Sequence, residues 1–236
     1  MLEPAGMGTM RLLIDDVGHD MSLPFRRESD ETDRLLALSD GVIAIAITLL
    51  VLEITVPVVP TGASESALPT RVLEQWNEFF GFVLSFSVVG LYWVLHRRVF
   101  VHVERHTKEI VWLNLLFLLM VAFVPYATSM FSTYPGRFGV MFLAGVLTLT
   151  GFSLAALWLY ASRSELIEEG ITSRTVGIQA ARFLASPLVF VASILVAAFD
   201  STVAIFLWVL LIPINAALQS RLIESVEVSG RGSDGR

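Results

Sequence analysis

The sequence predicts an all-α, polytopic membrane protein with six transmembrane helices. Apolar residues make up 55% of the 236-residue chain and charged residues only 16%, whereas a soluble domain carries about 25% charged residues. The apolar residues gather in six stretches, each close to the ~20 residues that an α-helix needs to cross a bilayer. Cysteine is absent, which excludes disulfides, thiolate metal sites and cysteine nucleophiles. No basic, aromatic-interleaved patch indicates nucleic-acid binding.

Three regions follow one another along the chain. Residues 1–33 are polar and acidic and predict a disordered N-terminal tail that lacks the apolar core of a signal peptide. Residues 34–220 hold the predicted spans, and residues 221–236 predict a second disordered tail. A proline-rich loop at 57–76 separates the first two spans, and the last two form a tight hairpin around Asp200. The spans are expected at 35–56, 77–96, 110–130, 138–161, 183–199 and 202–220.

The distribution of basic residues predicts which side of the membrane each loop faces. With the N-terminus inside, all of the 16 Lys and Arg residues except Arg71 and Arg137 fall in inner segments. Because loops rich in Lys and Arg stay in the cytoplasm, both termini are expected there, and the protein is expected in the cell (inner) membrane. Trp76, Trp93 and Tyr134 lie near span ends, where aromatic belts form.

The first span carries the polar residues that most need an explanation. Asp40 follows Ser39 at the inner mouth of an apolar helix, and an Asp at the centre of such a helix costs roughly 2.5–3.5 kcal/mol. Glu53 ends the same span, about 20 Å away at 1.5 Å per residue. Two charges at opposite mouths of one helix fit a cation pathway, and they equally fit plain anchoring of the helix ends.

One side of this helix is an apolar stripe with one hydroxyl. At 100° per residue, four residues fall within roughly 100° of one another: Ile45, Thr48, Leu49 and Leu52. The stripe fits either a helix–helix seam or the wall of a narrow pore. Several copies around an axis would stack its apolar side chains into rings, which stop ions by dewetting. Ordinary bundle packing explains the same residues when they are taken alone.

A polar cluster is expected at the inner end of the first three spans. Arg34 and Asp40 are six residues apart, about 240° of helix rotation, so they do not pair on one helix and need partners on neighbouring helices. His96 and Asn114 lie at the same membrane depth on the second and third spans. The cluster could act as helix glue, at about 0.6–2 kcal/mol per hydrogen bond, or, for Asp40, as an ion contact.

The sequence predicts no enzyme and no cofactor. It lacks GxSxG, HExxH, a Walker A loop and GxGxxG. His102 and His106 are four residues apart, but two His without a third ligand are a weak metal signal, and a solvated basic loop is the preferred interpretation. A proton-coupled transporter would show carboxylates near mid-membrane in several helices, whereas here the acidic candidates flank the first span alone.

Three stretches together resemble one known family. The first span resembles the Arg-x-x-x-Phe-Ser-Asp signature of the transmembrane protein 175 family of endolysosomal and bacterial potassium channels through the stretch RLLALSDGVIAIAITLLVLEI. The second and third spans match the same family through SFSVVGLYWVLHRRVF and WLNLLFLLMVAFVPYAT. The resemblance covers roughly residues 34–130 and is weaker over 131–220. Leu38 stands where the family has Phe, and this difference removes an aromatic contact.

The resemblance implies a homotetramer in the lipid bilayer, in which each six-helix subunit gives its first helix to a central pore without a Thr-Val-Gly-Tyr-Gly filter. It places the narrowest constriction at Ile45, extends the gate to Leu49 and Leu52, and links Thr48 to potassium preference. It also implies a signature polar cluster, comprising Arg34, Ser39, Asp40, His96, Trp112 and Asn114.

The expected function is passive permeation of potassium and other monovalent cations through a hydrophobic constriction. Asp40 and Glu53 would concentrate cations at the two mouths. Two alternatives stay open. A proton-coupled secondary transporter would lose coupling in an Asp40→Asn variant, and a non-conducting membrane scaffold would use the polar cluster for assembly alone.

Overall fold

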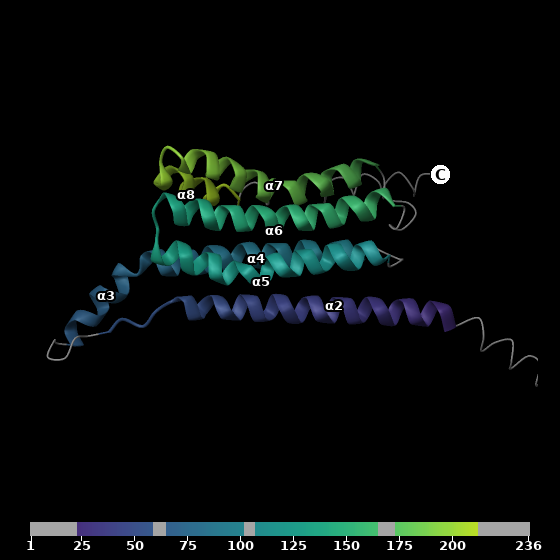
Figure 1. The fold of residues 1–236 in the computed structure, drawn as a ribbon, viewed down its shortest axis with the longest axis horizontal. Coiled ribbons are helices and arrows are strands. Elements are labelled where there is room, and N and C mark those ends of the chain that lie inside the picture. Colours follow the sequence, from purple (N-terminus) through teal and green to yellow (C-terminus); the bar gives the residue numbers. More distant parts are fainter. Residues whose placement is uncertain (1–22, 59–64, 102–106, 165–172, 212–236) are drawn as a thin grey trace, which may run out of the picture.

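The computed structural model describes residues 23–58, 65–101, 107–164 and 173–211, and within these ranges it contains helices and no strand (Figure 1). In chain order the elements are α2 (Leu23–Leu49), η1 (Leu50–Glu53), η2 (Glu65–Ala67), α3 (Leu68–Glu74), α4 (Trp76–Val101), α5 (Lys108–Thr133), α6 (Arg137–Arg163), α7 (Ser173–Ala197) and α8 (Ser201–Val209).

Five of these helices are long and apolar enough to cross a membrane. Helices α4, α5 and α6 qualify over their whole length, α2 with η1 over Asp33–Glu53, and α7 over Gly177–Ala197. They agree with the first five predicted spans. The sixth, expected at 202–220, begins as α8 directly after the Asp200 turn, and its second half lies outside the described residues. The all-helical membrane architecture is thus confirmed, and the sixth crossing stays a prediction.

The helices are stacked in layers (Figure 1). Helix α2 forms one outer layer and packs on α4 and α5, which pack on each other; α6 follows on α5, and α7 with α8 closes the far side. The core lies around α6, where two thirds of the membrane-length window is buried (67%). The outer layer is consequently the helix with the most surface left for contacts outside this chain.

Helix α6 is held to its neighbours by close side-chain packing on Gly151 and by one buried tyrosine. The hydroxyl of Tyr92 on α4 donates to the carbonyl of Leu147 at 2.9 Å and lies 2.7 Å from the Ser186 hydroxyl on α7. A Cβ on Gly151 would lie only 2.7 Å from that Tyr92 oxygen and 2.9 Å from Pro187 Cδ. The position therefore requires glycine, because real Cβ atoms do not approach that closely.

Two helix starts differ from the prediction. Helix α2 begins at Leu23, so the predicted disordered tail of residues 1–33 is wrong from Leu23 onwards. Pro24 suits a first helical turn because its missing N–H has no acceptor there, and the charged stretch after it is rich in good helix formers. Helix α7 begins at Ser173 instead of near residue 183, so Arg182 lies inside a helix and not in a loop.

Candidate functional site

A chain of hydrogen bonds joins α2, α4 and α5 at the end where α4 ends and α5 begins. The Nδ2 of Asn114 donates to Ser39 Oγ at 2.9 Å, and Ser39 Oγ donates to the Leu35 carbonyl at 2.8 Å. The Nε2 of His96 lies 2.7 Å from Asn114 Oδ1, and because that oxygen only accepts, the imidazole nitrogen is the donor. All three side chains are fully buried, so α2 is fixed to the bundle at this point.

The His96 ring is surrounded by aromatic side chains. It stacks on Phe117 at 5.2 Å between ring centroids and tilts against Phe100 at 4.8 Å. Its Nδ1 atom has no hydrogen-bond partner in the described part of the chain. The ring therefore holds Asn114 with one nitrogen and packs with the rest, which is an arrangement for positioning helices.

Asp40 lies next to this hydrogen-bond chain but takes a different partner. Its Oδ1 accepts from the indole Nε1 of Trp93 at 2.8 Å, and the carboxylate itself is exposed. Sequence reasoning assigned Trp93 only to an aromatic belt and missed this contact. Trp93 and His96 are three residues apart and so share one face of α4, which was the available signal. An exposed carboxylate held by one bond stays free to attract cations.

Two residues of the predicted signature cluster are not brought into it. Arg34 is exposed and makes no hydrogen bond or ion pair with any described residue, and Trp112 is 72% exposed on α5. Among the described residues, the cluster therefore consists of Ser39, His96 and Asn114, with Asp40 beside it. Arg34 and Trp112 lie outside it.

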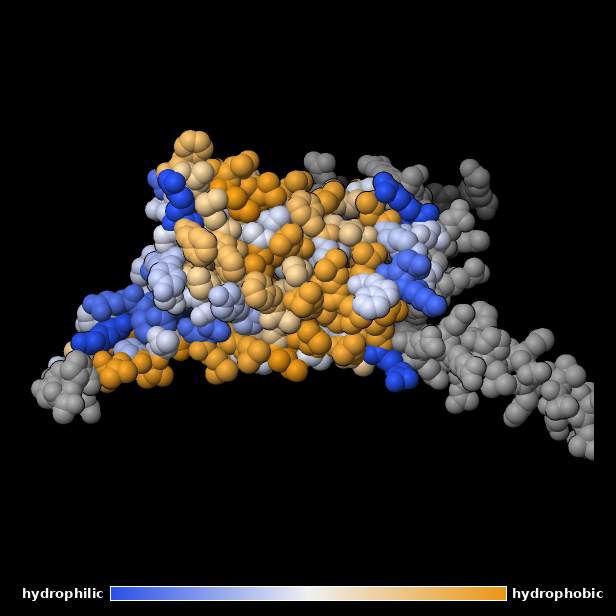
Figure 2. Space-filling view, in the orientation of Figure 1, coloured by the Kyte–Doolittle hydropathy of each residue, from blue (hydrophilic) through white to orange (hydrophobic). Residues whose placement is uncertain are grey.

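The predicted stripe of α2 faces away from its own chain. Ile45 is 61% exposed, whereas Ile43 and Ala46 on the other side of the helix are almost completely buried (2% and 3%). Figure 2 shows apolar side chains along the lower edge of the molecule, where Figure 1 places α2. The whole stripe is exposed: Ile45, Thr48, Leu49 and Leu52. Close packing of these residues against another described helix is therefore excluded.

The hydroxyl of Thr48 has a defined orientation. Its Oγ1 donates to the Ile45 carbonyl one turn earlier at 2.8 Å. Because the single hydroxyl proton is used in this bond, the oxygen presents only lone pairs to its exposed side. That is a polarity that could replace water around a cation, and the link between Thr48 and potassium preference stays a prediction.

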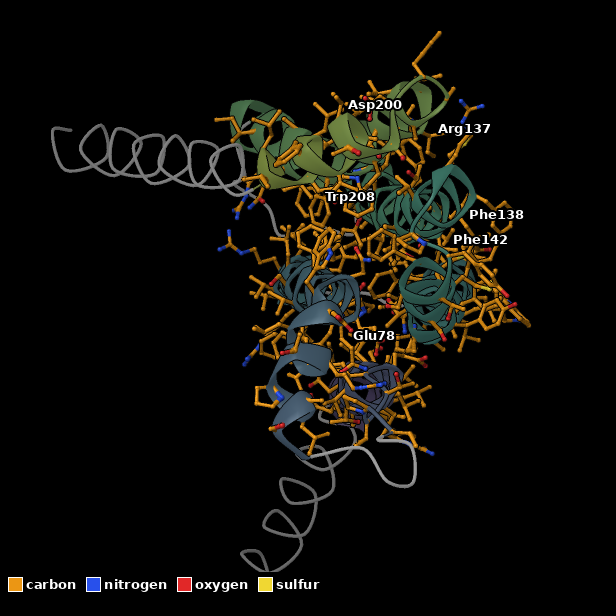
Figure 3. All side chains as sticks on the ribbon, turned by 90° about the vertical axis from the view of Figure 1, so that its left-hand side faces the viewer. Glu78, Arg137, Phe138, Phe142, Asp200 and Trp208 are labelled. Carbon is orange, nitrogen blue, oxygen red and sulfur yellow. The ribbon has the colours of Figure 1, made fainter. Side chains whose placement is uncertain are left out.

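The opposite end of α2 carries a second carboxylate site, seen in Figure 3 at the Glu78 label. The backbone N–H and the hydroxyl of Thr55 donate to Glu78 Oε2 at 2.7 Å and 3.0 Å, and Gln75 Nε2 donates to the Thr55 carbonyl at 2.6 Å. Glu78 lies in the first turn of α4, where the helix dipole favours a negative charge. Sequence reasoning missed Glu78. Glu53, the acidic residue expected from the sequence at this end, is half-buried and makes no hydrogen bond to any described residue.

No group of three or more His, Asp or Glu side chains that could hold a metal ion is found in the part of the chain that the structure describes. The weak His102 and His106 candidate lies outside those residues. The arrangement offers fixed helices, an exposed apolar stripe, an oriented hydroxyl and carboxylates near the stripe's two ends. These elements suit passage of an ion better than covalent chemistry.

Comparison with known proteins supports this interpretation. Residues 34–125 match the family model described as endosomal/lysosomal potassium channel TMEM175. A potassium channel of Streptomyces collinus is 38% identical over 140 residues, which cover 57% of this chain and 66% of the relative. A potassium channel of Chamaesiphon minutus is 37% identical over 145 residues, covering 58% of this chain and 70% of the relative. This chain belongs to the TMEM175 family.

The TMEM175 fold extends over most of the chain. The crystal structure of a lysosomal potassium-selective channel TMEM175 homolog from Chamaesiphon minutus matches with a TM-score of 0.68 and 28% identity, over 80% of this chain and 98% of the homolog. The family match begins at Arg34 and includes the hydrogen-bonded Ser39, His96 and Asn114. The predicted resemblance is confirmed, and the family is one of ion channels and not of enzymes.

Proposed function

We propose that this protein is a potassium-permeable cation channel whose pore is lined by the exposed face of α2. Its membership of a potassium-channel family supports the activity. One observation carries the placement of the pore: the most apolar of the five described membrane-length helices turns Ile45 and its neighbours outwards, away from every other described helix.

The pore requires several copies of the chain, and a homotetramer with six crossings per subunit is proposed. The α2 face that would meet the other copies contains three small, exposed residues, Ala37, Gly41 and Ala44. Small residues let helix backbones approach closely in membranes. Arg34 and Trp112, which have no partner in the described chain at this end, would meet groups of a neighbouring subunit.

Conduction would be passive and controlled by a hydrophobic constriction. Stacked rings of Ile45, Leu49 and Leu52 would exclude water, and a dewetted constriction stops ions until it widens or hydrates. Thr48 would offer oxygen lone pairs to a partly dehydrated cation. Asp40 and Glu53 would raise the local cation concentration at the two mouths.

The buried hydrogen bonds would set the position of the pore helix. Ser39, His96 and Asn114 fix α2 to α4 and α5 one to two turns before Ile45, so a displacement at this cluster would move the constriction. In the membrane, the end that carries this cluster would face the cytoplasm of a cell (inner) membrane, with both termini on that side, because the basic residues gather there.

Potassium flux from liposomes tests the proposal. Flux from vesicles with wild-type protein should exceed that from empty vesicles, and Ile45→Asn should raise it because a polar side chain hydrates the constriction. Leu188→Asn is the matched control: Leu188 is similarly exposed (56%) but lies on α7, the layer farthest from α2, and should leave flux unchanged.

The alternatives give different results in the same vesicles. No flux from folded wild-type and Ile45→Asn protein would contradict the channel and favour a scaffold. Saturable flux that moves protons with potassium, and loses this coupling in Asp40→Asn, would instead show a secondary transporter.

A further inference from the structure

Helix α7 contains a buried arginine that no described residue neutralises. Arg182 is 2% exposed, and its Nε and Nη1 atoms have no hydrogen-bond partner in the described part of the chain. A guanidinium has five N–H donors and keeps its charge in proteins. A buried cation without a partner is among the costliest groups in a structure. Arg182 therefore needs an anion.

The side chains around Arg182 define where that anion would lie. Gln179, Arg182 and Ser186 follow at spacings of three and four residues, so they share one face of α7. Ser186 is hydrogen-bonded to Tyr92 of α4, so this face is directed at α4. Because Cα–Cβ bonds tilt towards a helix N-terminus, Arg182 leans towards the start of α7, which is the same end of the bundle as the end of α4.

A second cation and an amide lie at the same end of the bundle. Arg98 is three residues before the end of α4. Gln179 is 8% exposed, and its Oε1 atom is also without a partner among the described residues. Gln179 lies one turn nearer the end of the bundle than Arg182. An anion bound at Arg182 would also be attracted by the positive charge of Arg98.

The described carboxylates at this end of the bundle are engaged elsewhere or exposed. Asp40 accepts from Trp93, and Glu109 accepts from the Tyr160 hydroxyl at 3.3 Å. Asp33 is exposed at the start of the first span. None of these three makes an ion pair with Arg182, so the described residues provide no negative charge that neutralises it.

We propose that the side of α7 that faces α4 binds an anionic phosphate group at Arg182, with Arg182 as its main ligand and Arg98 as the second cation. The planar guanidinium fork matches the oxygens of a phosphate in a bidentate manner, and the amide of Gln179 can turn its N–H₂ group to a third oxygen. The same chemistry is offered by an anionic phospholipid headgroup and by free inorganic phosphate. The site lies at the basic end of a membrane bundle, where anionic headgroups concentrate.

Binding to delipidated, purified full-length protein tests the proposal without any measurement of ion flux. Thermal unfolding would be followed with added phosphatidylglycerol, with phosphatidylcholine, and with inorganic phosphate against chloride at equal ionic strength. We expect phosphatidylglycerol to raise the unfolding temperature more than phosphatidylcholine does, because a ligand that binds only the folded state stabilises it. A comparable rise with inorganic phosphate would support the same site with a soluble ligand.

Three variants identify the ligand residue. Arg182→Gln should lose the anion-dependent rise, with binding weakened by about tenfold or more, and should unfold no earlier than wild type without ligand, because its uncompensated charge is gone. Arg98→Gln should weaken binding by a smaller factor. Arg163→Gln, an exposed arginine at the same end of the bundle, is the matched control and should respond as wild type.

Two results would overturn the proposal. The first is an equal anion response in wild type and Arg182→Gln, or no response in either, with Arg98→Gln also unchanged. The second is a large loss of stability in Arg182→Gln without any ligand, which would mean that a carboxylate of the chain itself already pairs with Arg182.

Discussion

Helices α2 and α6 are both membrane-length and apolar, and yet they have opposite environments. The membrane-length window of α2 has a mean hydropathy of 2.5 and is 22% buried, whereas that of α6 has 2.1 and is 67% buried. The more apolar helix is thus the less enclosed one. Inside a bilayer, apolarity does not separate core from surface, because lipid tails are as apolar as leucine. Close packing by small residues and buried hydrogen bonds marks the interior instead.

The largest expected contrast between the two helices comes from adding one methyl group to a glycine. Gly151→Ala on α6 forces Tyr92 or Pro187 to move and should lower the free energy of unfolding by about 1–3 kcal/mol. Gly41→Ala on α2 meets no atom within 4 Å and should raise it by up to about 1 kcal/mol, since glycine weakens a helix. Thermal unfolding in detergent measures both. Equal effects would mean that α6 is not the packed centre.

The polar contact between α2 and the rest of the chain should give the next largest effect. Asn114→Leu removes both the bond to Ser39 and the bond from His96, and should cost about 1–3 kcal/mol because a buried donor is left unpaired. Ser39→Ala removes one of these bonds and should cost less. Denaturation measures the free energy of unfolding of both variants. A larger loss in Ser39→Ala than in Asn114→Leu would show that Asn114 does not organise the cluster.

A smaller effect is expected for the bond between Trp93 and Asp40. Trp93→Phe keeps the ring but removes the indole N–H, and should cost about 0.5–1.5 kcal/mol. It should also increase the mobility of the Asp40 carboxylate and so alter the salt dependence of cation flux. Trp76→Phe on the same helix, where the indole has no bond to a described residue, provides the control. No difference between the two variants would count against a role for this bond.

The sequence was sufficient for the helices and for the exposed face of α2, and insufficient for contacts between helices. Membrane-length apolar stretches and the 3.6-residue period depend on local sequence only, so the spans and the stripe around Ile45 could be predicted. Trp93 and Glu78 were missed because their partners, Asp40 and Thr55, lie on other elements, and no spacing along the chain reports that. The span expected at 183–199 also left Arg182 just outside the membrane, whereas α7 begins at Ser173.

The smallest effect on stability, but a specific one on selectivity, is expected at Thr48. Thr48→Val keeps the shape of the side chain and removes the oxygen, and because the residue is exposed the free energy of unfolding should change by less than about 0.5 kcal/mol. The ratio of potassium to sodium flux should fall. Thr55→Val, beyond the end of α2, tests whether any threonine near the pathway has this effect. An unchanged flux ratio in Thr48→Val would exclude the hydroxyl from ion contact.

Cysteine accessibility tests most directly whether the outward face of α2 lines an ion path. The chain has no cysteine, so Ile45→Cys introduces a single thiol, and Leu188→Cys on α7 provides a lipid-facing comparison. A water-soluble, positively charged thiol reagent should react with the cysteine at position 45 and block potassium flux from liposomes, and it should leave flux unchanged in Leu188→Cys. A conducting Ile45→Cys protein whose flux is unaffected, although mass measurement shows complete modification, would contradict the pore assignment.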